Sequence, residues 1–215
     1  MDSAIQKKLD SFFLEFKQQK YTKGEVLIRA DENPSGVLYL TKGLVKVYCI
    51  SEKGDEIILN IFQPISFFPM SWAVNDVPNS FFYEAVSEVS LYQAPKNEVL
   101  IFLKKNPDVL FDLLQRVFKG VDGMLTRMTY LMAGSAHTRL ITEIIIAAKR
   151  FGTQDEHGIS VNISEKDLAL QTGLTRETVS REMGVLKKQG LVSFNKKVLK
   201  VLNMVRLASE VSGTL

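Results

Sequence analysis

The segment 163–192, "ISEKDLALQTGLTRETVSREMGVLKKQGLV", carries the most specific structural signal in the chain. Ser164 and Asp167 have the spacing of a capping box, which predicts the start of a helix. Gly173 follows where a tight turn needs a residue that tolerates positive φ, and Thr175 is suited to cap a second helix. A helix, a four-residue turn and a second helix with polar N-terminal residues form the helix-turn-helix layout.

The two sides of the second helix differ in polarity. Val179, Met183 and Leu186 fall on one side, where they predict contact with a core. The segments "LVSF" and "VLKVL" that follow flank "NKK" and predict a basic hairpin, or wing, with Lys196 and Lys197 at its turn. A structural three-helix unit with a solvated charged face is the alternative, but it explains fewer of these features. The candidate nucleic-acid contacts on the helix are Thr175, Arg176, Glu177, Thr178, Ser180 and Arg181.

Charge is unevenly placed along the chain. The net charge is +3, yet residues 160–200 hold eight Lys or Arg against four Asp or Glu, a balance of +4 that leaves −1 for the remainder. A weakly acidic body with a basic C-terminal quarter predicts a polyanionic partner at that end. Together with the helix-turn-helix pattern, this favours double-stranded DNA as the partner.

Length and composition are those of an ordinary globular protein. The chain has 215 residues, enough for one large domain or two small ones, with 46% apolar and 24% charged residues. No apolar run approaches the roughly 18 residues that a membrane helix needs, and the N-terminus lacks the pattern of a secretory signal. We therefore expect a cytoplasmic protein without membrane contact.

Several chemistries are disfavoured by what the sequence lacks. Cys49 is the only cysteine, which excludes an internal disulfide framework and a cysteine-ligated iron–sulfur cluster within one chain. No Walker motif, HExxH motif, nucleophile elbow or Cys/His metal spacing is present. The sequence therefore predicts neither an enzyme nor a metal site.

The residue pattern of the N-terminal half changes near Tyr21. Before it, five apolar residues at helical spacing predict an amphipathic helix over 5–16. From Tyr21 to Pro95, short β-rich runs such as "GVLYLTKGLVKVYCI" and "DEIILNIF" are separated by turn residues. Several short strands with regular turn signals predict an antiparallel sandwich or roll, so the expected fold class is α+β.

From Pro107 the sequence predicts one long helix that ends near residue 132. A row of apolar residues that repeats every seven positions (Leu110, Val117, Met124, Leu131) lies beside an a/d heptad row. We expect one row to pack on the helix's own domain and the other on a second copy of the chain, which makes the protein a homodimer. A plain core helix is the alternative. The heptad row, which is the candidate dimer interface, consists of Phe111, Leu114, Phe118, Val121, Leu125, Met128 and Met132.

A break in composition, "AGSAH" at 133–137, follows the long helix. This break and the start of the long helix at Pro107 divide the chain into three expected parts. These are a β-roll domain with flanking helices over 1–106, a dimerisation helix with its hinge over 107–134, and a winged helix-turn-helix domain over 135–215.

The segment 66–85, "SFFPMSWAVNDVPNSFFYEA", holds six aromatic residues in twenty, whereas the whole chain is 9% aromatic. Two interpretations are open: the rings form the core of the N-terminal domain, which we favour, or they line a pocket for a small apolar ligand. A haem would need an axial ligand, and both histidines, His137 and His157, are distant in sequence from the β-rich region.

The chain resembles the Crp/Fnr family of transcription regulators, the cyclic-AMP receptor protein family, over nearly its whole length. "LTRETVSREMGVLKKQGLV" is similar to the family's recognition helix, and "HTRLITEIIIAAK" to the helix that opens its DNA-binding domain. The segment from "KGEVLIR" to "DEIILNIF" resembles its β-roll, and the heptad helix resembles its dimerisation helix. The resemblance implies a homodimeric sensor that binds palindromic operators and acts on RNA polymerase.

The effector contacts of the family's cyclic-nucleotide-binding members are replaced in this sequence. The resemblance places Phe68-Pro69-Met70 on the triplet whose glutamate meets the ribose, and Asn79-Ser80-Phe81 on the triplet whose arginine meets the cyclic phosphate. Met124 and Leu125 stand where a polar pair meets the purine. Without its guanidinium, a bound phosphate still bears the desolvation cost of its charge, so we expect no cyclic-AMP binding. No cofactor is predicted and the effector is not assigned; the candidate pocket residues are Phe68, Met70, Trp72, Asn79, Ser80, Phe82 and Met124.

The resemblance also implies roles in base reading. Arg181 matches the family arginine that contacts guanine, and Glu177 matches the glutamate that accepts a hydrogen bond from cytosine N4. Half-sites with a TGA core follow from this match. The main alternative is a small-molecule-binding sensor module with an apolar or haem-like ligand and only weak DNA binding.

Overall fold

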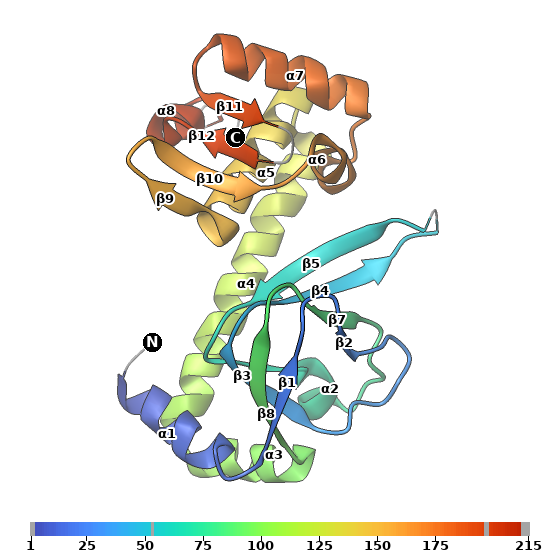
Figure 1. Ribbon diagram of the computed structural model, residues 1–215, viewed down its shortest axis with the longest axis vertical. Helices are drawn as coiled ribbons and strands as arrows, with labels where there is room; N and C mark the ends of the chain where they lie inside the picture. The colour runs from blue at the N-terminus through green and yellow to red at the C-terminus, as the bar shows by residue number, and fades with distance from the viewer. Residues whose placement is uncertain (1–2, 53, 196–197, 212–215) are drawn as a thin grey trace. The chain divides into compact units, whose positions relative to one another are not determined.

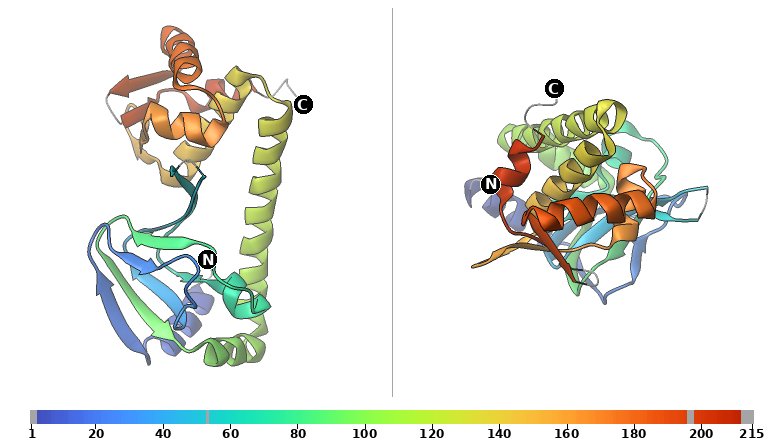
Figure 2. Two further views of the ribbon diagram at one scale, coloured as in Figure 1. Left: turned by 90° about the vertical axis from the view of Figure 1, so that its right-hand side faces the viewer. Right: turned by 90° about the horizontal axis from the view of Figure 1, so that it is seen from above.

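The computed structural model describes residues 3–52, 54–195 and 198–211. The chain forms two compact units, Met1–Val117 and Phe118–Leu215 (Figure 1). The division falls within α4 (Pro107–Ala133), which runs as one uninterrupted helix (Figure 2). Each unit has a hydrophobic core of its own.

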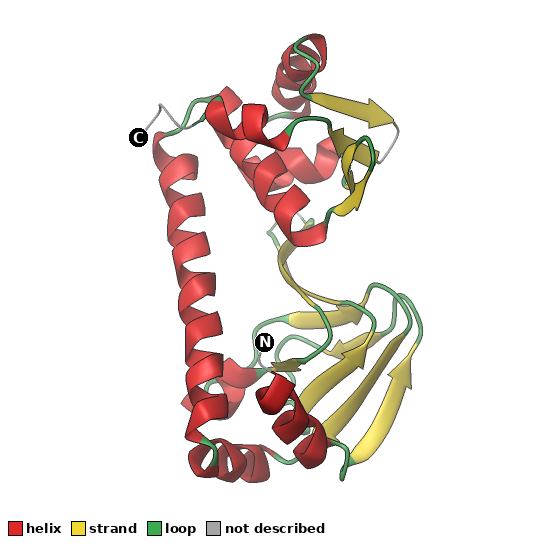
Figure 3. Ribbon diagram, turned by 90° about the vertical axis from the view of Figure 1, so that its left-hand side faces the viewer, coloured by secondary structure: helices red, strands yellow, loops and turns green. Residues whose placement is uncertain are grey.

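The N-terminal unit is an antiparallel β-roll built from two four-stranded sheets. One sheet has the order β1–β8–β3–β6 and the other β2–β7–β4–β5, and neighbouring strands run antiparallel. Figure 3 shows the strands of the roll in yellow. This arrangement confirms the predicted roll. The strands are β1 (Lys17–Tyr21), β2 (Val26–Ile28), β3 (Val37–Lys42), β4 (Val45–Ile50), β5 (Glu56–Phe62), β6 (Ser66–Phe68), β7 (Phe82–Ala85) and β8 (Val89–Ala94).

Strand β3 shows why this sheet needs helices on its outer face. Successive side chains on a strand point to opposite sides. Val37 and Tyr39 pack with α1 (Ser3–Phe13) and α3 (Lys96–Lys105), whereas Leu38 and Leu40 pack between the two sheets. All four residues are buried, so the strand reads as a continuous apolar run rather than as an alternating one.

The bounds of two helices of this unit were not predicted from the sequence. Helix α2 (Met70–Asn75) follows directly after β6, beyond the cis peptide bond between Phe68 and Pro69. Helix α3 lies between β8 and α4 and packs against α1, where the rings of Phe12 and Phe102 stack with centroids 4.2 Å apart.

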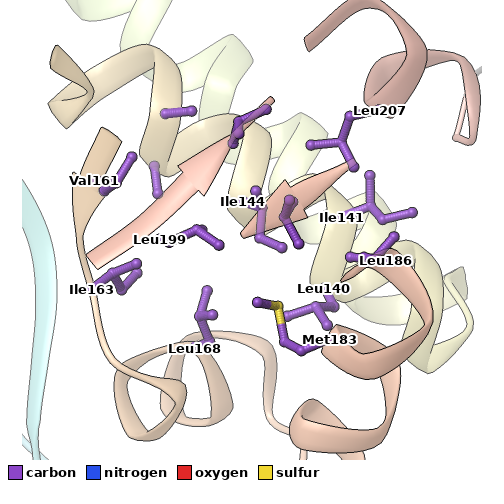
Figure 4. Packing of buried hydrophobic residues seen from close by; sticks show 14 of the residues in the cluster. Leu140, Ile141, Ile144, Val161, Ile163, Leu168, Met183, Leu186, Leu199 and Leu207 are labelled. Atoms are coloured by element: carbon purple, nitrogen blue, oxygen red, sulfur yellow. The ribbon is translucent and has the colours of Figure 1, made fainter. Parts of the chain in front are cut away.

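The C-terminal unit packs four helices around a small sheet of order β11–β12–β10–β9. Its core draws on every one of these helices and on three of the strands, as Figure 4 shows for Leu140, Leu168, Met183, Leu199 and Leu207. The hairpin β9–β10 and helix α8 were not predicted, whereas the helix-turn-helix and the wing strands were. The elements are α5 (Ala136–Phe151), β9 (Thr153–Asp155), β10 (Gly158–Asn162), α6 (Glu165–Thr172), α7 (Arg176–Lys188), β11 (Val192–Asn195), β12 (Val198–Val201) and α8 (Met204–Ser209).

The packing of α4 corrects one sequence expectation. All seven residues of the heptad row are exposed, and so are Leu110, Val117 and Met124 of the second row. The expectation that one row packs on the helix's own domain is therefore wrong. A third face does so instead: Val109 and Leu113 join the core beside α1 and α3, and Arg116 Nη1 donates to the Ile65 carbonyl at 3.0 Å.

Candidate nucleic-acid interface

The turn between α6 and α7 is fixed by local hydrogen bonds. The Asp167 N–H donates to Ser164 Oγ at 3.1 Å, and the Ser164 N–H donates to Asp167 Oδ2 at 2.9 Å, which completes the predicted capping box. Gly173 ends α6 at φ +65°, a conformation that favours glycine. Thr175 Oγ1 accepts from the Thr178 N–H at 3.2 Å and caps α7. The position of the turn and both caps are confirmed, but three residues, 173–175, separate the helices instead of the predicted four.

Helix α7 is divided into a buried and an exposed side. Val179, Met183 and Leu186 are fully buried in the core of the C-terminal unit. Five of the six candidate contacts, including the cap residue, are exposed, while Thr178 is half-buried. The apolar side therefore anchors the helix, and its first two turns present the polar side to solvent: Arg176, Glu177, Ser180 and Arg181.

Local hydrogen bonds keep Glu177 ionised. Its own backbone N–H and the Thr175 hydroxyl hold the pKa of the Glu177 carboxyl below its ordinary value, and the Arg176 guanidinium lowers it further. A lowered pKa means that the group loses its proton at a more acidic pH than usual. Glu177 is thus a carboxylate acceptor throughout the neutral range, as contact with a cytosine amino group requires.

The wing follows directly from α7. Strands β11 and β12 pair antiparallel from Val192↔Val201 to Asn195↔Val198. Lys187 Nζ lies 5.3 Å from the centroid of the Phe194 ring, a cation–π contact that joins α7 to β11. Lys196 and Lys197, the predicted phosphate contacts of the wing, lie outside the described residues.

A hollow of about 490 Å³ lies beside the start of α6. The sequence did not reveal it, because its walls come from four separate elements. Lys166 and Arg176 stand in it beside Glu165 and Asp167, so its charge is mixed. The other lining residues are Asn162, Ser164 and Phe194.

Two candidate effector residues of the N-terminal unit, Phe68 and Phe82, contribute to aromatic packing. Phe68 is 1% exposed, and its ring stacks against Phe62 at 4.6 Å and Tyr83 at 5.3 Å, between the two sheets. Phe82 stacks on Tyr48 with centroids 5.2 Å apart. Three rings of segment 66–85, those of Phe68, Phe82 and Tyr83, are therefore stacked on other rings of the roll. This agrees with the interpretation of the aromatic segment as core.

Asn79 and Ser80 are neighbours in the sequence but differ in burial. Asn79 is buried, and its Nδ2 donates to the carbonyls of Arg29 at 2.9 Å and Phe81 at 2.8 Å. Its Oδ1 accepts from the Phe81 N–H at 3.3 Å, so the amide is fully used in holding the turn. Ser80, by contrast, is exposed.

The remaining candidates lie on helices. Met70 and Trp72 are half-buried on α2, where Lys96 Nζ lies 5.1 Å from the centroid of the Trp72 ring. Met124 is exposed on α4, in the other compact unit. A cavity of about 160 Å³ in the N-terminal unit is lined by other residues, among them Gln19, Ser35 and Gln93.

The described part of the chain holds no cluster of three or more His, Cys, Asp or Glu that could bind a metal ion. Within it, no helix is long and apolar enough to cross a membrane.

Comparison with known proteins gives two family matches. Residues 18–106 match the family described as the cyclic nucleotide-binding domain, and residues 138–210 match the Crp-like helix-turn-helix domain. The chain is 27% identical over 216 residues to the global nitrogen regulator of Synechocystis sp., covering 97% of this chain and 94% of that protein. It is 24% identical over 200 residues to the cAMP-activated global transcriptional regulator CRP of Pasteurella multocida, covering 92% and 96%.

Solved structures share the fold. A CRP/FNR-family transcriptional regulator from Thermus thermophilus superimposes with a TM-score of 0.75 at 20% identity, covering 93% of this chain and 100% of that one. The c-di-GMP responsive global regulator CLP of Xanthomonas campestris also gives a TM-score of 0.75, at 16% identity and 94% and 100% coverage.

Proposed function

The chain belongs to the Crp/Fnr family of DNA-binding transcription regulators, and from that premise we propose that it acts as a homodimer on inverted-repeat operators in duplex DNA. It is a regulator and not an enzyme. The observation that carries the proposal is the exposure of Arg176, Glu177, Ser180 and Arg181 on a helix whose opposite side is anchored in a core. Bound in this way, the dimer acts on RNA polymerase.

Six of the eight candidate residues have an assigned chemical role in this proposal. Arg181 donates two hydrogen bonds to guanine O6 and N7, and Glu177 accepts one from cytosine N4. Arg176 and Thr175, together with Lys196 and Lys197, meet phosphates, which position the protein without specifying sequence. The operator is then two inverted TGA-containing half-sites about one helical turn apart.

A selection from random duplexes tests this reading. The wild-type protein should enrich TGA-type inverted repeats, and Arg181→Ala should lose about 1–3 kcal/mol of preference at one base pair. Arg206→Ala is the matched control, because Arg206 is an exposed arginine on α8 outside the candidate set. Enriched sites without an inverted TGA repeat, or an Arg181→Ala protein with unchanged preference, contradict the assignment.

The dimer in this proposal forms through α4. The heptad row is exposed over its whole length in a single chain, and such an apolar stripe is stable in water when a second helix covers it. Residues 107–134 thus form the dimerisation helix and hinge, between a sensor part (1–106) and a DNA-binding part (135–215).

Val121→Glu with Leu125→Glu should give monomers by light scattering. Leu59→Glu, at an exposed site in β5, is the control that should remain dimeric.

The sensor part does not bind cyclic AMP in the way the family's nucleotide-binding members do. Three observations support this: Pro69 stands in place of the glutamate, the amide of Asn79 is used within its own turn, and Phe68 is stacked within the core. Calorimetry with high-micromolar cyclic AMP should show no saturable heat. One saturable site per chain contradicts the proposal.

A further inference from the structure

Glu182 joins the recognition helix α7 to the start of α5. It follows Arg181 on α7, and its side chain is only 16% exposed. Glu182 Oε2 lies 3.0 Å from His137 Nδ1, and Oε1 lies 3.5 Å from Arg181 Nε. His137 belongs to the first turn of α5 and is the last residue of the composition break at 133–137. One carboxylate therefore contacts side chains from two helices.

The contact with Arg181 is not one that helix geometry supplies by itself. Neighbouring residues on an α-helix point about 100° apart and do not face each other. The Arg181 side chain therefore bends toward Glu182 to bring Nε within 3.5 Å of the carboxylate, while 69% of it stays exposed. Because Nε is the atom engaged, both terminal amino groups remain for another acceptor.

We propose that Glu182 is a positioning residue that orients Arg181 for base reading, and that His137 holds Glu182 in place. The inference rests on the proposed function, in which Arg181 reads a guanine. A guanidinium held at Nε presents its two terminal amino groups as a fork, which matches guanine O6 and N7. Because the contact with Glu182 restricts the Arg181 side chain, less freedom is lost when the side chain binds.

The carboxylate also changes how Arg181 interacts with incorrect sequences. A free arginine gains affinity from any nearby phosphate, whatever the base sequence. Glu182 offsets part of that charge, so a duplex without the correct guanine gains less from Arg181. Both effects raise the preference for one base pair rather than the affinity for all DNA.

The test is a ratio of two affinities measured on the full-length protein. Competition binding compares the selected operator with a duplex in which the guanine assigned to Arg181 is replaced. Glu182→Ala should reduce the ratio about two- to fivefold, the range of an exposed ion pair. Glu182→Gln, which keeps the size and one acceptor oxygen, should fall between Glu182→Ala and the wild type. Because each ratio uses one protein preparation, any loss of folded protein cancels from it.

Glu165→Ala is the matched charge control. Glu165 lies on α6 of the same unit, and among the described contacts it forms no ion pair with Arg181 or His137. Removing its charge should change the affinity for both duplexes alike and leave the ratio unchanged. If Glu182→Ala also changes both affinities alike, its effect is charge alone and the positioning role is wrong.

Two further variants separate this inference from the proposed function. If Arg181→Ala leaves the ratio unchanged, the guanine assignment itself is wrong. If Arg181→Ala lowers it and Glu182→Ala does not, only the positioning role is wrong. His137→Ala should lower the ratio, and His137→Gln, which retains a donor for Glu182, should restore it. A wild-type ratio for His137→Ala overturns the role of His137.

Discussion

The interior of the β-roll and the outer side of α7 use their side chains in opposite ways. In the roll, Phe68 stacks against Phe62 and Tyr83 between the sheets, where the resemblance had suggested an effector pocket. On α7, the candidate residues Arg176 and Arg181 are exposed, and apolar residues on the opposite side hold the helix. In the roll, Phe68 is buried in packing, whereas on α7 the candidate arginines remain exposed to solvent.

This difference separates stability from recognition. A buried ring stabilises the fold through the apolar area that it removes from water, so its loss lowers the free energy of unfolding. An exposed polar residue on an anchored helix contributes little to folding, so its loss is felt in binding. Mutations in the two regions should therefore change different measurements.

The largest expected effect is that of emptying the roll. Phe68→Ala should lower the free energy of unfolding of the N-terminal unit by about 3–5 kcal/mol, because it removes a fully buried ring. Trp72 is the only tryptophan and belongs to this unit, so its fluorescence during urea unfolding reports on this unit. Phe81→Ala is the control; Phe81 is 38% exposed and should cost less than about 1 kcal/mol. Equal costs for the two variants refute the packing role of Phe68.

The helix-turn-helix was predictable because its signals are local. Ser164 with Asp167, Gly173 and Thr175 act within four residues of their own position, and the structure has each in its predicted role. The composition break at 133–137 was also visible, although its Ser135 serves as the N-cap of α5, with Oγ accepting from the Thr138 N–H at 3.1 Å.

What the sequence did not reveal depends on contacts between distant segments. Helices α2 and α8 have six residues each, too short for a helical period to be recognised. The face of α4 that packs on its own unit could not be chosen by periodicity, because the exposed rows are more apolar than the face that holds Arg116. Asn79 looked like a lost arginine contact, but its amide serves the carbonyl of Arg29, fifty residues away.

The C-terminal unit also contains a buried side chain that we expect to serve stability, in an ion pair between two helices. Glu143 on α5 is buried, and its Oε2 lies 3.1 Å from Arg127 Nε on α4. Arg127 Nη2 also donates to the carbonyl of Gln171 on α6 at 3.3 Å. Burial raises the pKa of the Glu143 carboxyl, and Arg127 and Arg150 oppose that rise.

Arg127→Ala should lower the free energy of unfolding by about 2–3 kcal/mol at pH 8, less than for a fully buried pair because Arg127 is 25% exposed. Without Arg127, the folded-state pKa of Glu143 rises further. As pH increases above the ordinary glutamate pKa, the unfolded chain loses the proton while the folded chain keeps it, so stability falls until the folded pKa is passed. The loss should therefore be smaller at pH 5 than at pH 8.

A double mutant isolates this pair. Arg127→Ala with Glu143→Gln removes the unpaired charge, so far-UV circular dichroism during urea unfolding should show most of the lost stability restored at pH 8. Additive losses from the two single variants would show that the ion pair does not couple the helices.

The smallest expected effect concerns Thr175, a residue that we expect to serve both the stability of the fold and the binding of DNA. Thr175 caps α7 and is also a candidate phosphate contact. Thr175→Ala should cost about 1 kcal/mol of stability, because the Thr178 N–H loses its acceptor. Thr175→Asp retains the acceptor and suits the positive end of the helix, so stability should stay within about 0.5 kcal/mol of wild type. Its carboxylate should nevertheless repel phosphates and weaken binding to all duplexes alike.

The cap of α5 provides the matched control for Thr175→Asp. Ser135→Asp retains the same kind of cap at a residue outside the candidate contacts, so the affinity for DNA should not change. Thermal unfolding and DNA titrations on the wild type, Thr175→Ala, Thr175→Asp and Ser135→Asp separate the two roles of Thr175. If Thr175→Asp and Ser135→Asp bind DNA equally well, Thr175 acts only as a cap, and the candidate interface begins at Arg176.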